Sequence, residues 1–176
     1  MGLSNILKVF GFFLLIVFAW SWYSTPFGVH VKGGWNTIKQ TRQALVYLRR
    51  EAPEYFELVT ENIDTVRYLF VEIQLDTFYS GYTEFSDNGA VQVTILKNGS
   101  EQDVLMHAGF LAHEACHGKQ FHDGRVPDMT ESEMEEECIQ VQADVLEQLG
   151  VKREIVEYYK NKAIESKWWE QGYPGL

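Results

Sequence analysis

Residues 111–118 read Leu-Ala-His-Glu-Ala-Cys-His-Gly, with two histidines four positions apart and a glutamate directly after the first. On an α-helix successive residues turn by about 100°, so His113 and His117 lie about 40° apart on one face. Two imidazoles in that arrangement can bind one Zn²⁺ ion. Glu114 lies beside this face, where a general base can take a proton from a water molecule on the metal. The stretch therefore predicts a metal-binding helix.

The sequence His113-Glu114-Ala115-Cys116-His117 resembles the HExxH motif of the zincin metallopeptidases. The predicted order of elements is also similar to that of zincins, with helices first, then strands, the motif helix and a further helix. The resemblance implies that an edge strand borders the substrate cleft just before the motif helix, and residues 90–96 are expected to be that strand. It extends over residues 90–150 and indicates metal binding, but it specifies no substrate.

The resemblance does not specify the third metal ligand, because two groups of zincins take it from different places in the chain. In metzincins the motif continues as HExxHxxGxxH, or with Asp in the last place. This chain has Gln120 where the glycine is required and Asp123 at the ligand position, while His122 is one residue off. In gluzincins the ligand is a glutamate on the next helix. The candidates there are Glu131, Glu133, Glu135, Glu136 and Glu137.

Helical phase separates these glutamates. With Met134 at 0° and a turn of about 100° per residue, the apolar positions of this segment form a stripe centred at about 50°. Glu135 and Glu131 fall inside the stripe, but Glu131 lies at the frayed start of the helix. Glu136 faces solvent, and Glu137 falls at the edge. A carboxylate directed into an apolar face is costly unless it is paired or bound to a metal. We therefore expect Glu135 to be the third ligand, with Glu137 and Asp123 as the alternatives.

A second pattern on the same segment agrees with this assignment. Gluzincin-like proteins often carry Glu-x-x-Ala on this helix, and Glu135-x-x-Cys138 resembles that pattern with Cys in the Ala place. An alignment on Asp144 is the alternative. It would put Gln140 at the ligand position and impair the metal site.

The chain has two cysteines, Cys116 and Cys138, which are too few for a disulfide scaffold. Cys116 lies off the metal-binding face of its helix, and Cys138 faces the interior from the next helix. The two thiols can form a disulfide if these helices pack together in an oxidising compartment. They can also serve as two small buried hydrophobic residues. Both interpretations stay open at this point.

Residues 1–27 are interpreted as a membrane anchor. Residues 9–23 carry no charge, and the apolar run extends back to Leu3 around Lys8. A membrane-spanning helix needs roughly 17–25 mostly apolar residues, and the aromatic residues at 20–23 are typical of a membrane interface. The predicted localisation is therefore the membrane, through a single-pass N-terminal helix of open orientation. A cleaved signal peptide, with secretion of the remainder, is the alternative.

Residues 30–176 are predicted to form one α+β domain with a short β-sheet and the HExxH helix. Helical spacing predicts helices over 36–50, over 103–120, over 131–149 and over 152–167, and Pro53 is expected to begin another helix. Residues 66–75 and 77–84 are rich in β-branched and aromatic residues, and residues 90–96 alternate between apolar and polar. These three segments are therefore predicted to be strands.

The formal net charge of the 176 residues is −10, and no basic stripe is present. That balance argues against a nucleic-acid partner. The expected partners are a peptide or protein substrate, and the membrane through the N-terminal helix.

The predicted function is that of a membrane-anchored zinc-dependent peptidase. Glu114 is the expected general base, and Tyr79, Tyr82 and His122 are candidate donors to the transition state. The alternative is a catalytically inactive zincin-fold module that binds metal and is tethered to the membrane. The metal would be Zn²⁺, bound by His113, His117 and Glu135.

Overall fold

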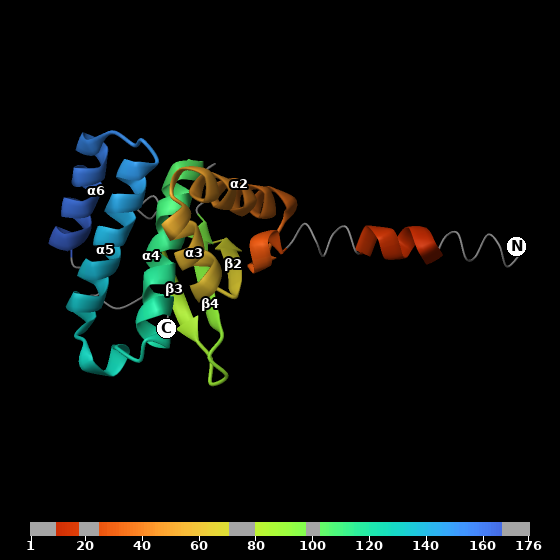
Figure 1. Cartoon of the computed structure of the whole chain (residues 1–176), viewed down its shortest axis with the longest axis horizontal. Coiled ribbons are helices and arrows are strands. Elements are labelled where there is room, and N and C mark those ends of the chain that lie inside the picture. The colour runs from red at the N-terminus through yellow and green to blue at the C-terminus, as the bar shows by residue number, and fades with distance from the viewer. Residues whose placement is uncertain (1–9, 18–24, 71–79, 98–102, 167–176) are drawn as a thin grey trace, which may run out of the picture.

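The computed structural model describes residues 10–17, 25–70, 80–97 and 103–166 (Figure 1). The chain is an α+β protein in which helices precede and follow a small sheet. Its elements are η1 (Pro26–Gly28), β1 (His30–Lys32), α2 (Trp35–Glu51), α3 (Pro53–Asn62), β2 (Thr65–Phe70), β3 (Ser80–Phe85), β4 (Val91–Lys97), α4 (Val104–His122), η2 (Val126–Asp128), α5 (Glu131–Gln148) and α6 (Arg153–Ser166). The helices agree with the predicted ranges to within two residues at each described end.

The sheet has the strand order β1-β2-β4-β3. β1, β2 and β4 run parallel, whereas β3 is antiparallel to β4. α2 and α3 connect β1 to β2, as a parallel pair requires. The prediction that residues 90–96 form the edge strand is wrong, because β4 lies between β2 and β3. The edge of the described sheet beside the motif helix is β3, which contacts α4.

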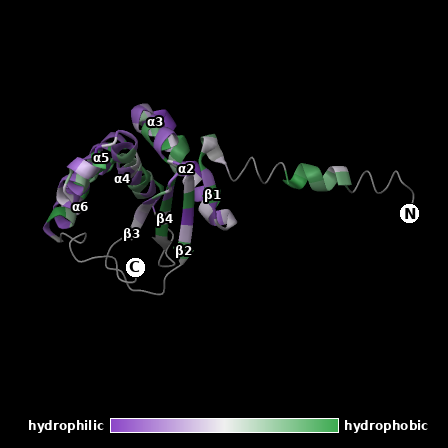
Figure 2. Cartoon of the chain, turned by 90° about the horizontal axis from the view of Figure 1, so that it is seen from below, coloured by the Kyte–Doolittle hydropathy of each residue, from purple (hydrophilic) through white to green (hydrophobic). Residues whose placement is uncertain are grey.

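The main core lies between one face of this sheet and the helices α2 and α4. Alternation along β4 directs Val93 and Ile95 to the same face, and both are fully buried. They belong to one apolar cluster with Ile38 and Leu45 of α2 and Leu111 of α4. Figure 2 shows the apolar strand residues running beneath the helices. Burial of this face fixes the position of α4 over the sheet.

The N-terminal half of α4 is also held by a buried polar network. His107 Nε2 lies 2.8 Å from the Tyr68 hydroxyl of β2, which lies 2.6 Å from the Thr41 hydroxyl of α2. Towards the C-terminal end, a Cβ added at Gly118 would lie 2.3 Å from the carbonyl oxygen of Asn62. The glycine is therefore needed for the close approach of α4 to the end of α3.

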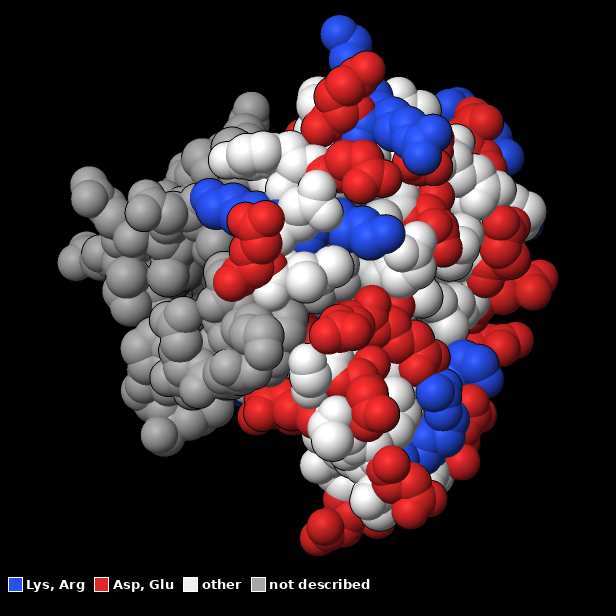
Figure 3. Space-filling view, turned by 90° about the vertical axis from the view of Figure 1, so that its left-hand side faces the viewer, with Lys and Arg blue, Asp and Glu red and all other residues white. Residues whose placement is uncertain are grey.

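α5 follows α4 after a short connection and begins with a capping box. The Thr130 hydroxyl accepts a hydrogen bond from the Glu133 N–H, and the Glu133 carboxylate accepts one from the Thr130 N–H. α5 packs against α4 and α6. Figure 3 shows acidic side chains outnumbering basic ones on the face turned to the viewer. Acidic residues in the first turn of α5 are favoured by the helix dipole.

The structure corrects the prediction of an N-terminal transmembrane helix and of a single-pass membrane localisation. Within the described residues, no helix combines the length and the apolar character needed to cross a membrane. The prediction rested on a count of apolar residues over 3–23, which records hydropathy alone.

Candidate metal centre

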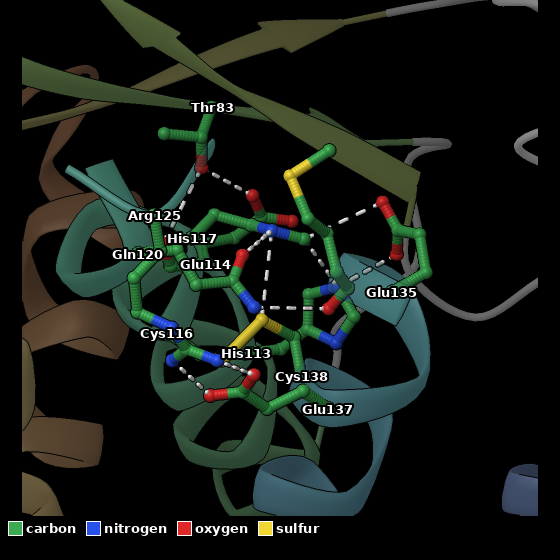
Figure 4. The surroundings of a disulfide bond; sticks show 11 residues. Thr83, His113, Glu114, Cys116, His117, Gln120, Arg125, Glu135, Glu137 and Cys138 are labelled. Atoms are coloured by element: carbon green, nitrogen blue, oxygen red, sulfur yellow. Dashed lines mark hydrogen bonds and ion pairs between the residues drawn. A yellow bond between two sulfur atoms is a disulfide. The ribbon is translucent and has the colours of Figure 1, made fainter. Parts of the chain in front are cut away.

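The two histidines of the motif lie one above the other on α4, as their spacing predicts. His113 Nε2 and His117 Nε2 are 3.3 Å apart, and the ring planes are nearly perpendicular. His113 is buried and His117 is nearly so, because this face of α4 is covered by α5. Both rings therefore direct the same nitrogen to one point between the two helices (Figure 4).

Glu135 of α5 supplies a carboxylate at that point. Its Oε2 lies 3.4 Å from His113 Nε2, and its Oε1 lies 3.4 Å from His117 Nε2. Glu135 is 7% exposed, so the helical-phase prediction of an inward-facing side chain is confirmed. Its helix begins at Glu131, and the buried face of α5, which includes Glu135, packs against α4.

The charges of this group favour an ionised carboxylate. Burial opposes ionisation of Glu135, but the interactions with His113 and His117 outweigh burial and lower its pKa to about 2. Burial likewise opposes protonation of His117, but Glu135 and the negative charge of Glu114 raise the pKa of His117 above its ordinary value. An ionised carboxylate beside two imidazoles is a suitable donor set for a divalent cation.

The spacing of the two imidazole nitrogens and the carboxylate also suits one ion. A tetrahedral site with bonds of about 2.0–2.2 Å places its ligand atoms about 3.3–3.6 Å apart. The two Nε2 atoms are 3.3 Å apart, and each lies 3.4 Å from a different oxygen of Glu135. With one ligand atom taken from each residue, the three atoms lie within 4.8 Å of one another. Within the described residues, Glu135 Oε2 and His113 Nδ1 are buried without a hydrogen-bond partner. A buried carboxylate oxygen without a donor is costly, and a cation at this point would satisfy it.

Glu114 lies next to this group and is held by β3. The Thr83 hydroxyl donates a hydrogen bond to Glu114 Oε2 at 2.5 Å, and Glu114 is 3% exposed. Thr83 faces α4 because alternate residues of a strand face opposite sides of the sheet. The edge strand therefore fixes the orientation of the predicted general base.

Gln120 holds the second histidine from one turn further along α4. Its Oε1 lies 3.1 Å from His117 Nδ1, and its Nε2 donates to the Met134 carbonyl at the start of α5. An amide oxygen can only accept, so this contact places a proton on His117 Nδ1. The lone pair of Nε2 is then left for a metal, as in metal sites where a second partner orients the imidazole.

A disulfide joins Cys116 of α4 to Cys138 of α5, with the two Cα atoms 5.4 Å apart. The first interpretation of the two cysteines, a disulfide between packed helices, is therefore confirmed. Both residues are buried, and Cys138 Sγ lies 3.5 Å from His117 Nδ1. The cystine is therefore in direct contact with the candidate metal centre (Figure 4).

The other predicted ligands make different contacts. Glu137 forms a two-point ion pair with Arg125 at 2.7 and 2.8 Å, and Asp123 pairs with Lys119 at 2.8 Å. Glu133 belongs to the capping box, and Glu136 accepts a hydrogen bond from Ser132. Gln140, which the alternative alignment put at the ligand position, donates a hydrogen bond to Asp144 on the surface of α5. Each of these carboxylates has its own partner away from the two histidines.

Of the predicted transition-state donors, the two that the structure describes do not lie at the group. Tyr82 precedes Thr83 on β3 and accepts a hydrogen bond from Arg67, so it faces away from α4. His122 lies 3.0 Å from Asn62 Oδ1 and 3.2 Å from the Gly89 carbonyl oxygen. Tyr79 lies outside the described residues.

Sequence reasoning missed two residues of the centre. Gln120 carried a usable signal, because it lies three residues after His117 on the same helix. Thr83 carried none, because its contact with Glu114 depends on the pairing of strands. No protein-family model, curated protein or solved structure matches this chain.

Proposed function

We propose that this chain is a zinc-dependent peptidase. The observation that carries the proposal is the convergence of His113, His117 and Glu135, with 3.3–3.4 Å between each pair of side chains. The carboxylate of Glu114 lies beside them (Figure 4). Two imidazole nitrogens and one carboxylate oxygen form a donor set that suits zinc, and three protein ligands leave a fourth position for water or substrate.

The residues divide the chemistry between them. Bound zinc supplies Lewis acidity, which polarises a carbonyl group and lowers the pKa of a water molecule. Glu114 accepts the proton of the attacking water and returns it to the departing amine. Because Thr83 binds Oε2 of Glu114, the other carboxylate oxygen performs the transfer. Gln120 keeps the proton of His117 on Nδ1, which leaves Nε2 as the ligand atom.

β3 is the proposed place for an extended substrate. It is the outer strand of the described sheet on the side of α4, and Thr83 on this strand touches Glu114. A peptide can add to such an edge through main-chain hydrogen bonds. A scissile bond bound there would lie close to the proposed base.

A second candidate function is metal binding without cleavage. The observation that favours it is burial, since Glu114 is 3% exposed and His113 is 5% exposed. A buried centre of this kind can stabilise a fold through its metal. The two functions differ in whether Glu114 has a chemical role.

Metal analysis of the full chain tests the centre itself. We expect one equivalent of zinc in the wild type and none in Glu135→Ala. Glu137→Ala is the matched control, because Glu137 lies two residues away and pairs with Arg125 instead. Equal zinc content in all three proteins would exclude Glu135 as a ligand.

Cleavage of a mixed peptide library separates the two candidate functions. We expect Glu114→Gln to keep its zinc and to lose cleavage at least a hundredfold, in the range that general bases contribute. Zinc without cleavage in the wild type, over a broad set of peptides, would favour the second function. Equal cleavage by the wild type and Glu114→Gln would remove Glu114 from the mechanism.

A further inference from the structure

The disulfide joins the same two helices that supply the three candidate ligands. Cys116 lies between His113 and His117 on α4, and Cys138 lies one helical turn after Glu135 on α5. A covalent link at this level fixes the separation of α4 and α5 where the donor atoms meet.

The cystine also touches one ligand directly. Cys138 Sγ lies 3.5 Å from His117 Nδ1, on the same side of the ring as Gln120. The imidazole of His117 is thus bounded by a sulfur atom and an amide, while its Nε2 faces Glu135. Movement of the sulfur atom would therefore move the surroundings of this ring.

We propose that the Cys116–Cys138 disulfide is a positioning element of the metal centre, so that metal affinity depends on its oxidation. This inference rests on the proposed metal site. Two thiols in contact need more space than two sulfur atoms joined by a bond of about 2.05 Å. Reduction would therefore separate α4 from α5 at the level of His117. Metal sites tolerate little displacement of their ligands, because bond lengths vary within about 0.2 Å.

Reduction proceeds by thiol–disulfide exchange with a dithiol reductant. One thiolate of the reductant attacks a sulfur atom of the cystine, and its second thiol resolves the mixed disulfide. The reductant ends as a cyclic disulfide, and two electrons and two protons convert the cystine into two thiols. Cys116 is 4% exposed and Cys138 is fully buried, so exchange requires local opening of α5 from α4.

The test compares the zinc affinity of three forms of the full chain by competition with a chromophoric chelator. They are oxidised wild type, wild type reduced by dithiothreitol and then desalted without oxygen, and the double variant Cys116→Ala/Cys138→Ala. We expect the reduced protein and the double variant to bind zinc at least tenfold more weakly than the oxidised protein. We also expect the double variant to be insensitive to the reductant.

Glu137→Gln is the matched control. It removes the ion pair between Arg125 and α5 at the position next to Cys138, but it leaves the cystine in place. We expect it to bind zinc as the wild type does, with the same loss on reduction. If oxidised Glu137→Gln lost as much zinc affinity as reduced wild type, any weakened contact between the Arg125 side chain and α5 would have the same effect. That result would overturn the specific role of the cystine.

The remaining outcomes separate this inference from the proposed function. Equal zinc affinity in all three forms would overturn the inference and leave the metal site standing. Absence of zinc from oxidised wild type would overturn both. Circular dichroism reports whether the double variant folds. If the double variant does not fold, the comparison of oxidised with reduced wild type tests the inference by itself, because reduction breaks the disulfide and leaves every side chain in place.

Discussion

The Thr83 hydroxyl of β3 donates a 2.5 Å hydrogen bond to the Glu114 carboxylate of α4. This contact joins the edge strand to the residue that we propose as the base. Its removal would leave a buried carboxylate oxygen without a donor, which costs about 1–3 kcal/mol.

We therefore expect Thr83→Val to lower the free energy of unfolding by about 1–3 kcal/mol and to lower kcat about 10–100-fold with little change in KM. Chemical denaturation and steady-state kinetics measure the two effects. Thr83→Ser is the control, because it keeps the hydroxyl. A Val variant with wild-type kcat would show that Glu114 does not need this partner.

Gln120→Leu is expected to weaken zinc binding about 10–100-fold, the range found when outer partners of metal ligands are removed. The physical reason is that His117 Nδ1 loses the amide oxygen that orients the ring and fixes its proton. Chelator competition measures the affinity. Gln140→Leu is the control, since Gln140 lies on the surface of α5 and contacts Asp144 of α5 and Lys160 of α6. Equal affinity in both variants would contradict the role of Gln120.

The capping box predicts a pH-dependent contribution to stability. Hydrogen bonds from the Thr130 N–H and hydroxyl lower the pKa of Glu133 below its ordinary value of 4.5. A lowered pKa in the folded state means that this stabilisation is present above pH 4.5 and is lost as the pH falls through the folded-state pKa.

We accordingly expect Glu133→Gln to be less stable than the wild type at pH 7, with the difference shrinking steadily below pH 4.5. Thermal unfolding across this range measures it. Glu136→Gln makes the same charge change on α5 outside the capping box, and its difference from the wild type should lack this trend. A constant difference for Glu133→Gln would rule out the ionised cap.

Gly118→Ala is expected to destabilise the fold by at least about 1–3 kcal/mol, as overpacking does in well-packed regions. The added Cβ would lie 2.3 Å from the Asn62 carbonyl oxygen, so α4 must move away from α3. For a chain of this size each kcal/mol lowers Tm by about 2–4 °C. Gly34→Ala is the control, because a Cβ there meets nothing within 4 Å.

Local periodicity was sufficient to predict the helices and the inward direction of Glu135. Both depend on the turn of about 100° per residue, which the apolar pattern reveals. The sheet order depends on pairing between distant segments, so β4 was mistaken for the edge strand. The contact between Thr83 and Glu114 was missed for the same reason.

Two other features lay beyond the sequence pattern. The pairing of Cys116 with Cys138 requires α4 and α5 to meet at one level, and composition leaves that open. The predicted membrane helix was wrong because an apolar run records hydropathy alone, and no helix among the described residues is long and apolar enough to cross a membrane.

The antiparallel pairing of β3 with β4 has a consequence for the folding pathway. The residues described at the candidate metal centre all lie between positions 83 and 138, in the segment that contains β3, β4, α4 and α5. Loop-closure entropy grows with the number of residues enclosed, so these contacts form at lower entropic cost than those with the N-terminal helices. We expect this segment to assemble first as a nucleus. The docking of Thr41 and Tyr68 onto His107 would then complete the molecule late in folding.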